Sequence, residues 1–571
     1  MDGPFLAAGL EELVEKFIRP DDHVHFAATM SRPNAVLHAT ARAFQNRKSL
    51  TVSVASLHSN AHALALSNSA KRVITCFLGD SYPSPRPCRL YRSVSSGEPF
   101  AAENWTLLSY VQRLMAAALG QPYAVTTSLA GTDLVTGKEG VLFTIPDPEC
   151  DERTVTLLKP LRPDIAVYHG VCADERGNIV LSSPHGEGVW AAYAARRGVV
   201  ASVERIVPTD VMAAHSPGCV IPSQRVLAIC EAPRGAHPQS LDSRGIAEIE
   251  GYDDDYRFMQ EASDACAEAP RAKAWFDAWI GLPGGHQQYL AKLDAHSNAG
   301  IFRNPRPTVL PGPERNHPGP LPTQKEALII LGARTIVEKV SAARSSGPSY
   351  DTLLAGVGVS HIAAWLAADQ LRTSGMPIKV VAEWGLYGML PEPGDTYLFS
   401  RSNAQRCEAS TGIAEILGGM VAGNRRCLGV IAAAEIDESG AVNTSRLRDG
   451  RWITGSGGGN DVASNADSIV IALASPERYV RKVAYVTSPG ARILDVVSQF
   501  GAFRRSSPEE KFELGSCLTV GMDGNSADPK QLVARYTSWT AETENARAEP
   551  YITSEELSRV RRLDPDGIYR S

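Results

Sequence analysis

Short runs of β-branched and other apolar residues alternate along the chain with longer stretches in which apolar residues recur at helical spacing. Near the start, residues 24–28 (VHFAA) predict a strand, residues 29–32 a turn, and residues 33–44 a helix with Pro33 in its first turn. Strands that alternate with helices form parallel sheets with covered faces, so the pattern predicts an α/β fold. The same pattern predicts strands at 50–55, 72–77 and 352–355, and a helix at 361–371.

A proline-rich stretch divides this pattern into two. Residues 304–322 (NPRPTVLPGPERNHPGPLP) contain seven prolines, and prolines at that density exclude helix interiors and central strands. We predict an ordered or semi-rigid linker there. It would join a domain of residues 1–303 to a domain of residues 323–571.

The two halves also contain similar sequence segments. Residues 173–179 (ADERGNI) and 436–442 (IDESGAV) both predict a strand, an Asp-x-x-Gly tight turn and a returning strand. The second copy lies close to half a chain length after the first. Together with the strand–turn–helix openings at 24–44 and 352–371, this repeated segment predicts two similar, open α/β halves.

Composition and charge limit the kinds of ligand. A chain of 571 residues is too long for one core, and 43% hydrophobic and 21% charged residues are typical of a globular protein. The formal net charge of -6, without a long basic run, gives no electrostatic case for nucleic acid. Residues 1–22 are acidic and amphipathic, unlike a signal peptide, and no apolar run reaches membrane-spanning length. We therefore expect a cytoplasmic protein with small-molecule substrates and no membrane contact.

The cysteines and histidines predict no metal site. The ten cysteines contain no CxxC pair, which argues against a zinc knuckle or a thioredoxin-like site, and they fit small core residues in a reducing compartment. His23 and His25 flank one strand residue and point to one face, but no nearby set of cysteines or carboxylates completes a ligand shell. We expect both histidines to be structural.

Glu383 is the leading candidate for chemistry. It follows the apolar, strand-like run 378–382, and glycines stand at 385 and 388. A carboxylate at the end of a buried strand, beside glycines that let the backbone approach closely, has the local setting of a nucleophile or a base. A strand-end glutamate in a solvated loop explains the same residues.

Two glycine-rich segments are candidates for ligand binding. Gly356 and Gly358 form a GxG turn before a helix, which can present backbone N–H groups to a phosphate or carboxylate. Because His361 replaces the third glycine, the full nucleotide fingerprint fails, and a plain tight turn is the alternative. Residues 455–461 (GSGGGND) have four glycines in five residues, which suits an oxyanion-binding nest; a flexible surface loop is the alternative.

Glu103 is a second carboxylate of interest. It falls near the predicted N-terminus of an amphipathic helix, where the helix dipole favours a carboxylate, so capping explains it without catalysis. The chain has no GxSxG elbow, which argues against a Ser–His–Asp hydrolase. The residues that fit the buried stripe of this helix are Trp105, Leu108, Val111 and Leu114.

Taken together, ordered segments over nearly the whole chain resemble the class I coenzyme A-transferase family, in particular its glutaconate CoA-transferase branch with two usually separate subunits fused. Segments 103–134, 162–179 and 284–293 are similar to the α subunit of that branch. Those that resemble its β subunit are 355–367, 381–388, 436–445, 455–463 and 481–493.

The resemblance implies an enzyme with the CoA-transferase (NagB/RpiA-like) fold in each half and an active site between the halves. It makes Glu383 the nucleophile that attacks an acyl-CoA thioester and then forms a glutamyl-CoA thioester, with ping-pong kinetics. Coenzyme A is then a thioester substrate, no cofactor is tightly bound, and the fused chain is expected to form a homodimer. The residues implied in CoA binding or oxyanion stabilisation are Gly356, Gly358, Gly457, Gly458, Asp461 and Ser31.

The chain departs from the family in two places, and two other functions stay open. Residues 27–31 (AATMS) replace a Gly-Gly-Phe turn, and Trp384 stands where a small residue commonly follows the catalytic glutamate. Trp384 either reshapes the acyl pocket or packs beneath it. One alternative function is an acyl-CoA hydrolase, including ring opening of a cyclic keto acyl-CoA with Glu103 as the working carboxylate. The other is a non-catalytic acyl-CoA sensor.

Overall fold

A computed structural model describes residues 3–215, 220–246, 248–297, 321–346, 349–390, 395–518 and 528–570. The predicted linker at 304–322 lies outside the described residues except for its last two positions. The domain boundaries drawn on either side of it therefore stay predictions.

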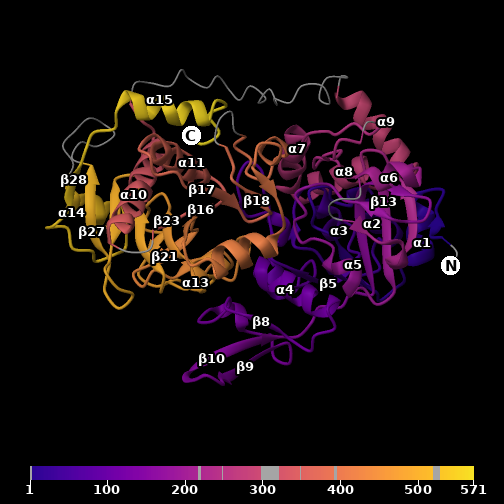
Figure 1. The fold of residues 1–571 in the computed structure, drawn as a ribbon, viewed down its shortest axis with the longest axis horizontal. Helices are drawn as coiled ribbons and strands as arrows, with labels where there is room; N and C mark the ends of the chain where they lie inside the picture. The colour runs from indigo at the N-terminus through magenta and orange to yellow at the C-terminus, as the bar shows by residue number, and fades with distance from the viewer. Residues whose placement is uncertain are drawn as a thin grey trace.

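The first half is built on a largely parallel sheet (Figure 1). Every neighbouring pair along its main path is parallel, and the short strands β12 (Ile179–Val180) and β14 (Val220–Ile221) pair beside it. The strand order is β1 (Phe5–Leu6), β15 (Val226–Glu231), β13 (Gly198–Val207), β11 (Ile165–Asp174), β2 (His23–Phe26), β3 (Leu50–Ser53), β5 (Ala70–Thr75) and β7 (Ala101–Asn104).

The second half carries a sheet with a parallel centre and antiparallel pairs on both sides of it, and its last strand again pairs in parallel. Its strand order is β19 (Ala409–Ser410), β18 (Leu386–Tyr387), β17 (Lys379–Ala382), β16 (Thr352–Ala355), β20 (Cys427–Ile431), β23 (Asp467–Ile471), β25 (Ile493–Val497), β26 (Gly501–Arg504), β27 (Glu513–Leu518) and β28 (Arg547–Glu549).

The two sheets share one core topology. The order β3-β2-β11-β13-β15 in the first matches β17-β16-β20-β23-β25 in the second, and the chain visits each set in the same sequence. The predicted Asp-x-x-Gly turns also match, because the N–H of Gly177 donates to Asp174 and that of Gly440 donates to Asp437, each over 2.9 Å. The predicted α/β fold with two similar halves is confirmed.

The helices and a small separate sheet complete the architecture. Helices α10 (Gln324–Ser346) and α11 (Val359–Thr373) pack together in the second half, and α4 (Leu107–Ala118) meets α13 (Gly459–Asn465) where the halves join (Figure 1). A three-stranded sheet that the sequence did not predict projects below this junction; it comprises β8 (Ala124–Thr126), β9 (Leu142–Asp147) and β10 (Cys150–Leu158).

The helices and strands predicted from the sequence agree with the observed ones to within a few residues, and two predictions need correction. Helix α2 spans Asn34–Ala43, so Pro33 is its N-cap residue and not part of the first turn. Glu103 lies on strand β7, and the cap of α4 is Thr106, whose hydroxyl accepts from the N–H of Ser109. The capping role expected for Glu103 is therefore wrong.

One hydrophobic cluster crosses between the halves. It joins Trp105 and Tyr110 of the first half to Trp384 and Leu417 of the second, and the predicted buried stripe of α4 belongs to it. Such a continuous apolar contact holds the two sheets in a fixed relation. Among the described residues, no helix has the length and apolar character needed to cross a membrane.

Candidate active site

A cavity of about 940 Å³ lies between the two halves. The first half lines it with residues that follow β2 and β3, such as Thr29 and His58, and the second with residues that follow β16 and β20, such as Val357 and Ala432. Strands β16 and β20 are neighbours whose onward connections run in opposite directions across the sheet. A ligand crevice is expected at such a switch point, outside the carboxyl ends of the strands.

Glu383 lines this cavity at the end of strand β17. The chain reverses directly after it, and the N–H of Gly385 donates to the carbonyl of Ala382 over 3.1 Å. Gly385 has a φ of 119°, and a Cβ there would collide with the carbonyl of Thr411. The turn thus needs glycine, and it directs the Glu383 carboxylate away from the sheet.

The surroundings of Glu383 make its carboxylate costly to ionise. Burial and, secondarily, the nearby Asp461 carboxylate raise the pKa of Glu383 to about 7, against the backbone N–H of Gly458, which lowers it. A poorly solvated carboxylate with a pKa near neutrality is typical of a catalytic group.

The glycine-rich loop before α13 meets Glu383 at one residue, Gly458. A Cβ on Gly458 would collide with Oε2 of Glu383, so glycine is required for the approach. The neighbouring N–H groups are already used: Gly455 donates to Thr444, Gly457 to Cys76 and Gly459 to Ser456, over 3.0 to 3.1 Å. The N–H of Gly457 is therefore engaged within the fold, but Gly457 lines the cavity, so its role in CoA binding or oxyanion stabilisation stays a prediction.

The two glycines of the GxG turn have different roles. The N–H of Gly356 donates to the carbonyl of Val430 over 2.8 Å, and a Cβ there would collide with that carbonyl, so Gly356 serves close packing of two strands. Gly358 has a φ of 94° and directly precedes helix α11. Both glycines line the cavity, with the start of α11 behind them.

Asp461 lies beside the site but does not line the cavity. Its carboxylate is fully buried on α13 and accepts from the N–H of Leu108 over 2.9 Å and from the hydroxyl of Ser128 over 2.7 Å. Burial raises the pKa of Asp461 to about 6, against these hydrogen bonds. The role predicted for Asp461 in CoA binding or oxyanion stabilisation stays a prediction; the residue links the two halves and places a negative charge near Glu383.

Ser31 and Glu103 also lie away from the cavity wall. The hydroxyl of Ser31 is buried and donates to the carbonyl of His169 over 2.9 Å. Glu103 pairs with Arg72 and Arg113 and accepts from the indole of Trp105 over 2.6 Å. These arginines lower the pKa of Glu103 although burial opposes them. The structure does not bring either residue to Glu383, and the ring-opening role considered for Glu103 has no support in this geometry.

Arg32 is a cavity residue that the sequence did not single out. It is only 8% exposed, and its guanidinium donates to the carbonyl and the hydroxyl of Ser56 over 2.8 and 2.7 Å. It also lies 5.3 Å from the ring centroid of Trp384. Trp384 thus packs against a cation at the cavity wall. The sequence signal that could have identified Arg32 is its position as a charged residue directly after the AATMS segment.

The charges along the cavity favour an anionic ligand. Among the described residues that line the cavity, seven have cationic side chains and two, Asp254 and Glu383, are acidic. An excess of guanidinium and ammonium groups suits phosphates and carboxylates. The cationic residues are Arg32, Arg86, Arg89, Arg92, Lys325, Arg451 and Arg478.

Residues 8–224 match the family model described as Coenzyme A transferase. The resemblance to the class I coenzyme A-transferase family inferred from the sequence is thus confirmed, and the comparisons support an enzyme, a CoA-transferase.

Curated relatives of this CoA-transferase include single subunits of two-subunit enzymes. One, from the 3-oxoadipate CoA-transferase of Pseudomonas knackmussii, is 29% identical over 287 residues, which cover 50% of this chain and 96% of the relative. Another, from the glutaconate CoA-transferase of Acidaminococcus fermentans, is 36% identical over 69 residues, which cover 11% of this chain and 26% of the relative.

A solved structure shares the fold over the whole length. An acyl-CoA transferase from Escherichia coli O157:H7, crystallised as a thioester complex with CoA, matches with a TM-score of 0.66 at 14% identity. The match covers 96% of each chain. At 14% identity, this similarity shows a shared fold of both halves and no more.

Proposed function

We propose that this CoA-transferase moves CoA from an acyl-CoA to a free carboxylic acid through a thioester on Glu383. The observation that carries the proposal is the Glu383 carboxylate itself. It stands at a strand end in the cavity between the halves, and its pKa is raised to about 7. Poor solvation makes a carboxylate a better nucleophile, while a pKa near 7 leaves much of it ionised at neutral pH.

The reaction would proceed through anhydrides and one stable thioester. An oxygen of Glu383 attacks the acyl-CoA carbonyl carbon and expels the CoA thiolate, which gives a mixed anhydride. The thiolate then attacks the glutamyl carbonyl carbon and expels the donor acid as its carboxylate. The acceptor carboxylate repeats these steps in reverse, so that the new acyl-CoA leaves and the Glu383 carboxylate returns.

Gly458 is placed to assist each attack on the glutamyl carbon. Its N–H interacts with the Glu383 carboxylate in the resting enzyme. In the anhydride or thioester the same N–H would face the glutamyl carbonyl oxygen, where negative charge develops during attack. One preorganised donor of this kind typically contributes about 3 kcal/mol to the transition state.

The cationic side chains suggest how the substrates are held. Arg86, Arg89 and Arg92 lie close together in the sequence on one loop of the cavity wall, and Arg451 lines it from the second half. These groups suit the phosphates of CoA, whose binding energy can be used to orient the thioester. Arg32 is a separate cation beside Trp384 and suits the carboxylate of an acid substrate.

The test is to trap the thioester. The enzyme is incubated with an acyl-CoA and no acceptor, reduced with borohydride and digested for mass spectrometry. Reduction of a glutamyl-CoA thioester converts the Glu383 carboxyl into a primary alcohol, so we expect that change at Glu383 and nowhere else. Glu408→Gln is a matched control, since Glu408 is an exposed glutamate of the same half that pairs with Lys379.

The kinetic result separates transfer from hydrolysis. Transfer requires acyl-CoA turnover that depends on added acid, with the parallel double-reciprocal plots of a ping-pong reaction. CoA release at full rate without any acid, together with an unmodified Glu383, would refute the proposal and leave acyl-CoA hydrolysis as the activity.

A further inference from the structure

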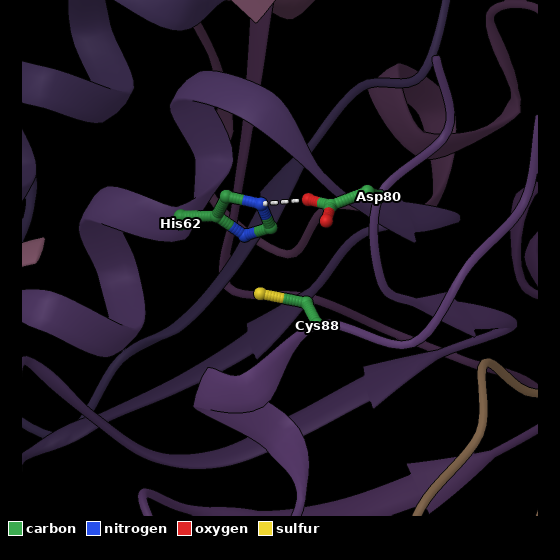
Figure 2. Close-up of side chains that lie close together, drawn as sticks. All are labelled: His62, Asp80 and Cys88. Carbon is green, nitrogen blue, oxygen red and sulfur yellow. Dashed lines mark hydrogen bonds and ion pairs between the residues drawn. The ribbon is translucent and has the colours of Figure 1, made fainter. Parts of the chain in front are cut away.

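Three potential metal ligands meet in the first half, although the sequence predicted no such set (Figure 2). They are His62 at the end of the short 3-10 helix η1 (Ser59–His62), Asp80 after strand β6 (Phe77–Leu78), and Cys88 before η2 (Arg89–Tyr91). One ligand atom from each lies within 4.8 Å of the others. The three residues are between 0% and 7% exposed.

Partners outside the set orient the ligands. Nδ1 of His62 lies 2.7 Å from the hydroxyl of Tyr91, and Nε2 lies 3.1 Å from Oδ1 of Asp80. The hydroxyl of Ser263 donates to Oδ2 of Asp80 over 2.7 Å. In protein metal sites, ligand histidines and carboxylates are commonly held by such outer hydrogen bonds.

The spacing of these atoms suits a small divalent cation. With metal–ligand bonds of about 2.0 to 2.3 Å, the ligand atoms of a tetrahedral zinc site lie roughly 3 to 4 Å apart. The nitrogen and oxygen of His62 and Asp80 are already at this separation, and the Cys88 sulfur needs only a small movement.

We propose that His62, Asp80 and Cys88 bind one zinc-type divalent metal ion. Binding requires His62 to hold its proton on Nδ1, donated to Tyr91, so that Nε2 is free for the metal. The Cys88 thiol releases its proton to solvent as the metal–sulfur bond forms. A histidine nitrogen, a carboxylate oxygen and a thiolate sulfur are all ligands that zinc takes in proteins.

The site would anchor the wall of the substrate cavity. Asp80 and Arg86 exchange two backbone hydrogen bonds of 3.0 Å, and Arg86, Cys88, Arg89 and Arg92 all line the cavity. A metal at Asp80 and Cys88 therefore ties down the loop that carries three of the cations. The proposal concerns structure alone and holds whether or not Glu383 is the nucleophile.

The experiment measures metal content and spectra of the full chain. Protein is isolated from zinc-supplemented and, separately, from cobalt-supplemented minimal medium, so that the buried site fills during folding. We expect about one metal ion per chain, and in the cobalt protein a thiolate-to-cobalt charge-transfer band together with the intense visible bands of tetrahedral cobalt.

Variants of the proposed ligands show whether the cobalt band and the bound metal come from this site. Cys88→Ser should abolish the charge-transfer band or cut it severely, and Asp80→Asn, which keeps the size of the side chain, should lower the metal content at least tenfold. Cys407→Ser is the matched control, because Cys407 is a free cysteine of the other half, and it should leave both readings unchanged. Wild-type protein that is well folded but carries no metal and shows no cobalt band overturns the proposal, as does a band that survives in Cys88→Ser.

Discussion

Glu383 shows how a single residue acquires its chemistry from its surroundings. The pKa of its carboxyl is raised to about 7 by burial and by Asp461, and only the ionised form is nucleophilic. We therefore expect kcat/KM for the acyl-CoA to increase with pH up to about 7 and then to level off. A pH–rate series with a non-titrating acyl-CoA measures this; a profile that is flat from pH 5.5 to 8.5 would contradict it.

The same residue opposes stability above neutral pH. A carboxyl whose pKa is higher in the folded than in the unfolded protein binds more protons when folded, so its contribution to stability falls as pH rises from about 4.5 to 7. Glu383→Gln should lower the rate of CoA transfer at least about 10³-fold. It should also raise the free energy of unfolding at pH 8 by about 1 to 3 kcal/mol. Denaturant unfolding at pH 8 and pH 5.5 checks the sign, since the gain should be smaller at the lower pH.

Gly458 allows a second prediction at this scale. A Cβ at this position would collide with Oε2 of Glu383, so Gly458→Ala must displace either the carboxylate or the donor N–H. We expect kcat to fall about 10²-fold, with a smaller change in KM. Gly419→Ala is the control, because no atom lies within 4 Å of a Cβ built there. Equal kcat values for the two variants would exclude the contact as important.

At the scale of elements, the junction of α4 and α13 connects fold and site. Asp461 on α13 accepts from the start of α4 and also raises the pKa of Glu383. A helix from one half is thus held by a carboxylate from the other, close to the reacting group.

Asp461→Asn separates the two effects of this junction. Removing the negative charge favours ionisation of Glu383, so the acid limb of the pH–rate profile should move to lower pH. Weakening the buried hydrogen bonds should cost about 1 to 3 kcal/mol of stability. Asp277→Asn, at an exposed aspartate that pairs with Lys273 and does not line the cavity, should change neither measurement. An unchanged pH profile in Asp461→Asn would refute the electrostatic coupling.

At the scale of the whole molecule, the cavity makes ligand binding a property of both halves. Its cations come from loops of the first half and from Lys325, Arg451 and Arg478 of the second. A ligand that bridges them stabilises the folded chain by mass action.

If ligand phosphates bridge these cations, the increase in Tm on ligand binding should depend on whether the ligand carries phosphates. Free CoA at 100 times its Kd should raise the Tm by about 2 to 3 °C for a chain of this length. Pantetheine, which lacks the phosphates, should give a much smaller shift at equal concentration. Scanning fluorimetry with both ligands makes the comparison, and equal shifts would show that the cations do not hold the phosphates.

The alternation of strands and helices, the repeated turns and the position of Glu383 at a strand end could all be read from the sequence. These features depend on side-chain periodicity and turn chemistry within a few residues, which neighbouring residues determine. The strand 352–355 and the glycines around it were placed correctly for that reason.

Tertiary structure alone decided how the site is built. The N–H of Gly457 is used by Cys76, Asp461 is enclosed by α4, Arg32 reaches the cavity beside Trp384, and Cys88 meets His62. Each of these pairings joins segments that are far apart in the chain or on different loops. Hydrogen-bond partners, burial and nearby charges arise only when the sheets pack together, so local sequence identified Glu383 as the candidate carboxylate but not the groups that surround it.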